Sequence, residues 1–110
     1  MSVLTIRAGK RFAVCAPAEV DRPQGKAVRA LLIELSLEGC RIGNVAGEAF
    51  TVGEAVAISV DGAEPFQAEV RGLGQGTVGL RLTRPFHIAE LGHLIATCRA
   101  ETGEARRLRA

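Results

Sequence analysis

The sequence predicts an all-β domain, a six-stranded antiparallel barrel with one C-terminal α-helix. Two observations lead to this fold class. Apolar and polar residues alternate along about six short segments before residue 84, which is the period of strands with one buried face. After Pro85 the apolar residues recur at helical spacing instead. A lone helix with one apolar stripe most economically plugs or covers such a barrel.

The first expected strand begins after Arg11, and its pattern weakens at Pro17. The side chains that the alternation places on one face are Phe12, Val14 and Ala16. Residues 21–25 then form a cluster of turn-forming types between two apolar runs. We expect this cluster to be an exposed connection.

The second expected strand is the next apolar run. Four large aliphatic residues of one parity should face the core: Leu31, Ile33, Leu35 and Leu37. Glu34 and Ser36 have the other parity, so they should point together toward solvent. Leu32 shares that parity and would offer a small apolar contact surface. Gly39 allows a bend or a close backbone approach, and residues 40–42 continue as a short strand.

Three further strands are expected to form a meander of consecutive antiparallel neighbours. Their core-facing residues are Val56, Ile58, Val60, Phe66, Ala68, Val70, Val78, Leu80 and Leu82. Asp61-Gly62 and the glycines between residues 72 and 76 are turn signals. Residues 74–79 match Gly-x-Gly-x-x-Gly, but a strand follows where a dinucleotide site needs a helix. We therefore interpret them as a hairpin turn.

The predicted helix spans residues 85–99, with Pro85 in its first turn. The residues on its apolar side are Ile88, Leu91, Leu94, Ile95 and Cys98. The length fits one domain over residues 1–110. Its expected parts are a flexible N-terminal arginine loop (1–11), the barrel (12–83), the helix (85–99) and a tail (100–110).

Composition argues against several classes of protein. The formal charge of +2 is too small for a non-specific DNA binder, and 4% aromatic residues leave few surfaces on which bases could stack. No stretch has the apolar length of a membrane span or of a signal-peptide core, so we expect a cytoplasmic protein without membrane insertion. The three cysteines lie at wide, patternless spacings. We expect them to be small buried residues in a reducing compartment, with no disulfide or zinc.

No catalytic or metal-binding set emerges from the sequence. His87, Glu90 and His93 lie three residues apart on the helix, which spreads them too widely for easy chelation. Ser36 lies inside a strand rather than on a strained strand-to-helix turn, and no histidine is near it in sequence. Because no acid, base and nucleophile come together, we expect no enzyme, no metal and no cofactor.

Two arginines, Arg7 and Arg11, stand directly before the first strand. A second element, Glu-Leu-Ser-Leu-Glu-Gly, occupies Glu34 to Gly39. Each guanidinium can donate two parallel hydrogen bonds, which suits ligands that offer planar acceptors and phosphates. Arginines at this spacing are common on protein surfaces. These two arginines indicate a binding site only because they precede the first strand directly and because the element from Glu34 to Gly39 follows at an exposed strand end.

This arrangement resembles the PilZ domain family, whose signature joins Arg-x-x-x-Arg to (Asp/Asn)-x-Ser-x-x-Gly. The resemblance covers approximately Arg7 to Cys98. It implies a six-stranded antiparallel barrel with a C-terminal helix, and cyclic di-GMP as the ligand. The residues that match the family's binding motif are Arg7, Arg11, Ser36 and Gly39, with Glu34 in the position where the family usually has Asp or Asn. The extra methylene of Glu34 moves its carboxylate by about 1.5 Å.

Two functions are compatible with this resemblance. The first is a receptor that orders its arginine loop around cyclic di-GMP and presents the altered surface to an unidentified protein partner. The second is a PilZ-like adaptor that binds protein partners and no nucleotide, because Glu34 departs from the motif. The sequence leaves open the output pathway, the oligomeric state and the number of ligand molecules bound.

Overall fold

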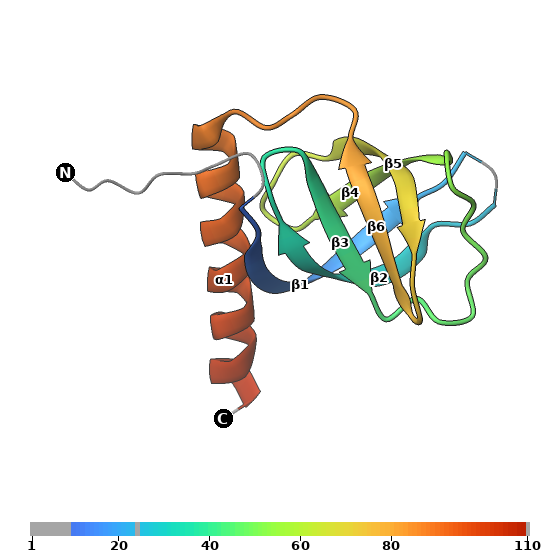
Figure 1. The fold of residues 1–110 in the computed structure, drawn as a ribbon. Coiled ribbons are helices and arrows are strands. Elements are labelled where there is room, and N and C mark those ends of the chain that lie inside the picture. Colours follow the sequence, from blue (N-terminus) through green and yellow to red (C-terminus); the bar gives the residue numbers. More distant parts are fainter. Residues whose placement is uncertain (1–9, 24, 110) are drawn as a thin grey trace.

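The computed structural model describes residues 10–23 and 25–109, with side chains for 10–23 and 25–99. This part of the chain contains six strands and one helix. In chain order they are β1 (Phe12–Asp21), β2 (Val28–Leu35), β3 (Gly39–Gly43), β4 (Ala55–Val60), β5 (Phe66–Leu73), β6 (Thr77–Leu82) and α1 (Ile88–Arg109). Figure 1 shows the strands wrapped into a barrel, with α1 standing along one side next to the start of β1.

The strands form a closed barrel in the order β1-β2-β3-β6-β5-β4, and every neighbouring pair is antiparallel. β4, β5 and β6 are consecutive neighbours, which confirms the predicted meander. The pairings of β3 with β6 and of β1 with β4 close the barrel. The predicted fold class, an antiparallel barrel with one C-terminal helix, is therefore confirmed.

β1 continues through Pro17 to Asp21, beyond the point at which the sequence pattern weakened. Proline has no backbone N–H to donate, so it is tolerated only where a strand lacks a neighbour on one side. Pro17 pairs with Leu31 of β2, whereas β1 pairs with β4 only from Ala18 onward. Pro17 therefore occupies an edge-like position inside a closed barrel.

The core is aliphatic, as the alternation predicted for β4, β5 and β6. All nine of the side chains predicted there are buried except Phe66, which is partly buried against the core. Leu91, Leu94 and Cys98 of α1 join the same cluster. Among the described side chains, none that is polar or charged is buried. Burial of apolar surface is thus the main force that holds the helix against the barrel.

The predicted orientation of β2 is wrong over its middle. Ala30 and Leu32 are buried, whereas Leu31 and Ile33 are half-buried. The pairing with β3 shifts register between Leu32 and Glu34, which marks a β-bulge. The bulge adds one residue to β2. Side chains of β2 before the bulge therefore face the opposite side from the one that the alternation counted from Leu35 predicts. Leu32 has no exposed surface, so the contact surface predicted for it does not exist.

The predicted bounds of the helix are also wrong at both ends. α1 begins at Ile88 rather than residue 85 and continues to Arg109, through the region expected to be a tail. The N–H of His87 donates to Oε1 of Glu90 at 2.7 Å, a capping bond that fixes the start three residues later than predicted. Ile88 lies outside the apolar stripe and is 55% exposed. No helix in the described part of the chain is long and apolar enough to cross a membrane.

The three cysteines differ in their surroundings. Cys40 and Cys98 are buried, as expected, but Cys15 is exposed because it has the opposite parity to buried Val14. Burial raises the pKa of the Cys40 thiol to about 12, so this thiol stays protonated at neutral pH. The expectation of three buried cysteines is therefore wrong for Cys15.

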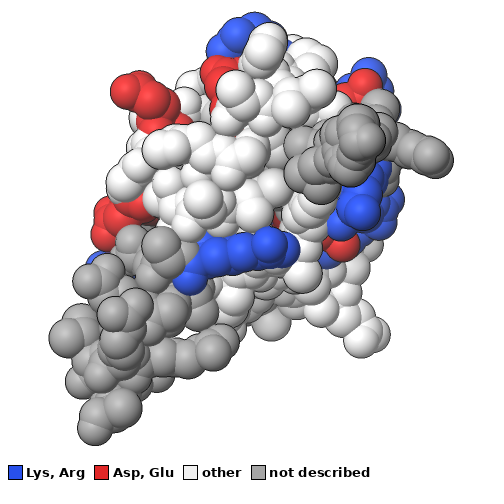
Figure 2. All heavy atoms as spheres, turned by 90° about the vertical axis from the view of Figure 1, so that its left-hand side faces the viewer, with Lys and Arg blue, Asp and Glu red and all other residues white. Residues whose placement is uncertain are grey.

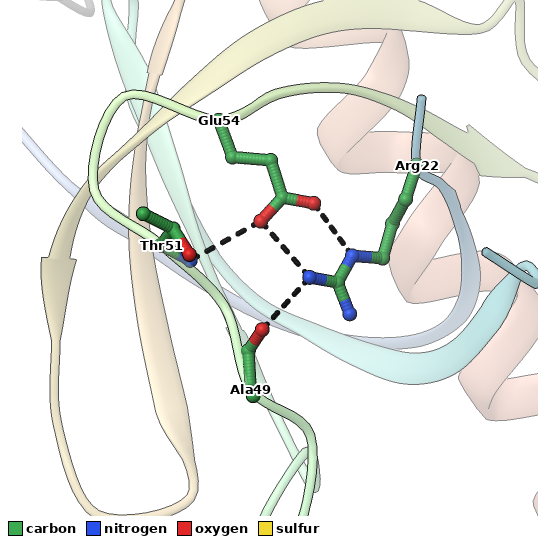
Figure 3. A network of polar contacts seen from close by, with 4 residues as sticks. All are labelled: Arg22, Ala49, Thr51 and Glu54. Carbon is green, nitrogen blue, oxygen red and sulfur yellow. Dashed lines mark hydrogen bonds and ion pairs between the residues drawn. The ribbon is translucent and has the colours of Figure 1, made fainter. Parts of the chain in front are cut away.

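An ion pair between Arg22 and Glu54 holds the long connection between β3 and β4 against the end of β1 (Figure 3). Arg22 Nε donates to Glu54 Oε2 at 2.6 Å, and Nη2 donates to Oε1 at 3.0 Å and to the Ala49 carbonyl at 2.8 Å. The Thr51 N–H donates to the same carboxylate at 3.1 Å, and the Arg22 guanidinium lies 4.4 Å from the centre of the Phe50 ring. This network fixes a connection that contains no strand, in addition to its backbone bonds with Val70 of β5.

Candidate functional site

A cavity of about 470 Å³ lies on the outside of the barrel, where β2 turns into β3. Outward-facing residues of β3, β5 and β6 form its remaining sides. Four arginines line it, namely Arg11, Arg41, Arg71 and Arg81. They outnumber the two lining carboxylates, Glu34 and Glu38, so the cavity is positively charged.

Four of the five predicted site residues line this one cavity: Arg11, Glu34, Ser36 and Gly39. Arg11 is more than twenty residues from the other three in sequence, but β1 and β2 are antiparallel and Ala13 is in register with Glu34. This pairing brings the residue before β1 to the end of β2. The fifth predicted residue, Arg7, lies outside the described residues.

Glu34 is the acidic centre of the cavity. One of its oxygens, Oε1, lies 3.8 Å from Nη1 of Arg11 and 3.6 Å from Nε of Arg41. The side chain of Glu34 is 32% exposed and that of Arg11 is 66% exposed, so water screens both pairs. Such pairs contribute about 0–1 kcal/mol each. They orient the two arginines without holding them firmly.

Ser36 and Gly39 shape the turn that ends at the cavity. The Ser36 hydroxyl accepts from the Gly39 N–H at 3.1 Å, and the Ser36 N–H donates to the Gly39 carbonyl at 2.9 Å. A Cβ on Gly39 would lie 2.6 Å from the carbonyl oxygen of Leu80 in β6. The turn therefore needs a hydroxyl at position 36 and no side chain at position 39, whether or not a ligand is present.

Sequence reasoning missed three of the four lining arginines: Arg41, Arg71 and Arg81. Each points outward from a different strand, on the face opposite to its buried neighbours. The sequence did not indicate that β3 pairs with β6, because these two segments are far apart in the chain. With that pairing known, the outward parity of the three arginines would have identified the cavity.

A second cavity of about 570 Å³ lies between the start of α1 and the turn that connects β4 to β5. Phe66 and Phe86 meet there edge to face, with ring centroids 5.2 Å apart. Glu90 and His93 line it, but His87 does not. No three potential metal ligands gather anywhere among the described side chains. This cavity includes none of the predicted site residues.

In a comparison with known protein families, the model of the PilZ domain matches residues 5–100. Among curated proteins, no significant match to the chain is found. The matched segment begins before the arginine pair and includes all six strands and the buried part of α1. The barrel, the single helix and the match over most of the sequence agree, and the chain belongs to the PilZ domain family.

Proposed function

We propose that this chain is a cytoplasmic receptor domain for cyclic di-GMP. PilZ domains are in general cyclic di-GMP receptors, and they are binding or adaptor domains rather than enzymes. The observation that carries the proposal is that Arg11 and the turn from Glu34 to Gly39 line one positively charged cavity. Neither segment could form such a site alone.

The chemistry of the lining residues fits a guanine dinucleotide. An arginine fork donates two parallel hydrogen bonds to guanine O6 and N7, and the same charge pairs with a phosphate. The Glu34 carboxylate is an acceptor for the donor edge of guanine. Because the Arg11–Glu34 pair is long and exposed, Arg11 can leave Glu34 for the ligand at little cost.

Contacts next to the cavity support a route by which binding reaches α1. Arg99 of α1 donates to the carbonyl of Ala13 through Nη2 at 2.8 Å and Nε at 3.3 Å. Ala13 is in register with Glu34 and follows Arg11 by two residues. A ligand that moves Arg11 therefore acts on the strand segment to which the helix is attached. Figure 2 shows the face where α1 lies, and on it uncharged residues separate the described basic side chains.

Calorimetry tests the proposal. Cyclic di-GMP should bind with measurable heat, and GMP should not. Arg7→Ala or Arg11→Ala should abolish the heat, because each removes a fork, whereas Lys10→Ala should only weaken binding. Full affinity in both arginine variants would contradict the assignment.

A second function is supported by a specific observation. Glu34 is longer than the family's Asp or Asn, and its carboxylate already pairs with Arg11 and Arg41. A chain in which that carboxylate replaces the ligand's phosphates would be an adaptor for protein partners that binds no nucleotide. No heat from cyclic di-GMP with a folded wild-type protein would favour this adaptor over the receptor.

A further inference from the structure

Two glycines lie side by side on the outer surface of the barrel within the arginine-lined cavity. Gly79 of β6 is in register with Gly72 of β5 on one side and with Arg41 of β3 on the other. Gly79 faces outward because its neighbours Val78 and Leu80 are buried. We call Gly72 and Gly79 the glycine strip. It exposes backbone where two side chains would otherwise stand.

The guanidinium of Arg41 lies over Gly79, one of the two glycines of this strip. A Cβ built on Gly79 would be 3.7 Å from Nη2, 3.8 Å from Nη1 and 3.9 Å from Cζ of Arg41. Because the three atoms are nearly equidistant from that point, the planar group turns its face obliquely toward the glycine rather than its edge. The side chain remains 39% exposed, and Glu34 holds its Nε at 3.6 Å. Arg41 therefore has the sheet on one side and the open cavity on the other.

A purine that entered this cavity would find no aromatic ring on which to stack. The chain has no Trp or Tyr, and none of its four Phe lines the cavity. Phe50 is buried, and Phe66 and Phe86 pack against each other at the second cavity. A guanidinium plane stacks on bases in the same way as an aromatic ring. The guanidinium of Arg41 already turns a face toward Gly79, so it could serve as such a plane.

Arg71 and Arg81 lie beside the glycine strip, and their charges are not neutralised by a described carboxylate. Both are exposed, and no carboxylate among the described side chains forms an ion pair with either. Gly39 and Glu69 flank Arg81 in register. The two arginines can therefore meet the charge of a phosphate without first breaking a salt bridge.

We propose that Arg41 is the surface on which a guanine of the ligand stacks, and that Arg71 and Arg81 hold its phosphates. This inference rests on the proposed receptor function and extends it to residues outside the arginine loop and the β2–β3 turn. The two roles need different properties of arginine. Stacking at position 41 needs the planar guanidinium group, whereas phosphate binding at positions 71 and 81 needs only a positive charge.

Calorimetric titration with cyclic di-GMP separates these roles. Arg41→Lys keeps the positive charge but removes the planar guanidinium group on which the base would stack, and it should weaken binding about tenfold or more. Gly79→Val keeps every charge but fills the space beneath Arg41, and it should weaken binding by a similar factor. Arg71→Lys and Arg81→Lys should stay within about threefold of wild type, whereas the Arg71→Ala/Arg81→Ala double variant should lose about tenfold and respond less to added salt. Arg29→Lys, an exposed position on β2 away from the cavity, is the matched control.

The outcomes distinguish this inference from the receptor assignment. If wild type binds and Arg41→Lys and Gly79→Val bind equally well, the stacking role is overturned while the receptor assignment stands. If Arg71→Lys or Arg81→Lys loses as much affinity as the alanine variant, the charge-only role is overturned. If wild type gives no heat, the receptor assignment and this inference fail together. Thermal melting of each variant verifies that it is folded.

Discussion

The Arg22–Glu54 pair is the most enclosed of the four ion pairs between described side chains, with exposures of 16% and 12%. The hydrogen bonds from Arg22 hold the pKa of the Glu54 carboxyl below its ordinary value of 4.5. Burial opposes this shift, and the Thr51 N–H and the charge of Arg22 reinforce it. A lowered pKa means that the folded state favours the charged carboxylate, so the pair stabilises the fold above pH 4.5 and less as the pH falls below that value.

Glu54→Gln should therefore destabilise the protein at pH 7 by about 1–3 kcal/mol, since it weakens charge-assisted hydrogen bonds. Urea unfolding at pH 7 and pH 3 measures this. The difference from wild type should shrink at pH 3, because below pH 4.5 the carboxyl of the unfolded chain takes up a proton and part of the stabilisation is lost. Glu19→Gln, an exposed position on β1, is the control. An equal difference at both pH values would contradict the role of the ionised pair.

The glycine at position 39 gives a second prediction at the scale of one residue. Gly39→Ala places a methyl group 2.6 Å from the Leu80 carbonyl, so β3 and β6 must separate. We expect a loss of about 1–3 kcal/mol in the free energy of unfolding. Gly72→Ala on the same face has no atom within 4 Å of the new methyl and should cost little. Denaturant unfolding compares the two; similar losses would refute the steric account.

At the scale of the elements, alternation predicted the inward faces of β4, β5 and β6, because the register shift in this part of the sheet comes only after Val70, the last core residue predicted for β5. It failed for β2, where the bulge near Ile33 depends on the pairing with β3 and leaves no local signal. The start of α1 was misplaced for a different reason. Pro85 suggested a first helical turn, but the bond from His87 to Glu90 caps the helix later. A search for Glu three residues after a possible cap would have found it.

Arg99 provides a prediction about the attachment of α1. Its two hydrogen bonds to the Ala13 carbonyl connect the helix to the segment that carries Arg11. Arg99→Ala should raise the hydrogen-exchange rate of amides at the start of β1 and in the part of α1 near position 99, with a stability loss of about 0.5–1.5 kcal/mol. Arg84→Ala removes a side chain whose one ion pair with a described residue is the 3.9 Å contact with Glu90, and it should leave β1 unchanged. Unchanged exchange in Arg99→Ala would show that the helix is not coupled through this contact.

At the scale of the whole molecule, the sequence located half of the cavity. The motif residues on the first loop and on the β2–β3 turn were recognisable because each motif is local, and Arg11, Glu34, Ser36 and Gly39 do line one cavity. The half formed by Arg41, Arg71 and Arg81 was not, because it depends on closure of the barrel through β3 and β6. Closure also explains why Arg41 of β3 lies beside Gly79 of β6.

The most direct test of the receptor assignment is a titration of the ¹⁵N-labelled wild-type protein with cyclic di-GMP, followed by ¹H–¹⁵N NMR. Saturable shifts should concentrate at the backbone amides of Arg11, Gly39, Arg41 and Gly79, and the amides around the second cavity, such as Phe66, should stay in place. No shift at ligand concentrations in the millimolar range, or shifts confined to the second cavity, would contradict the assignment.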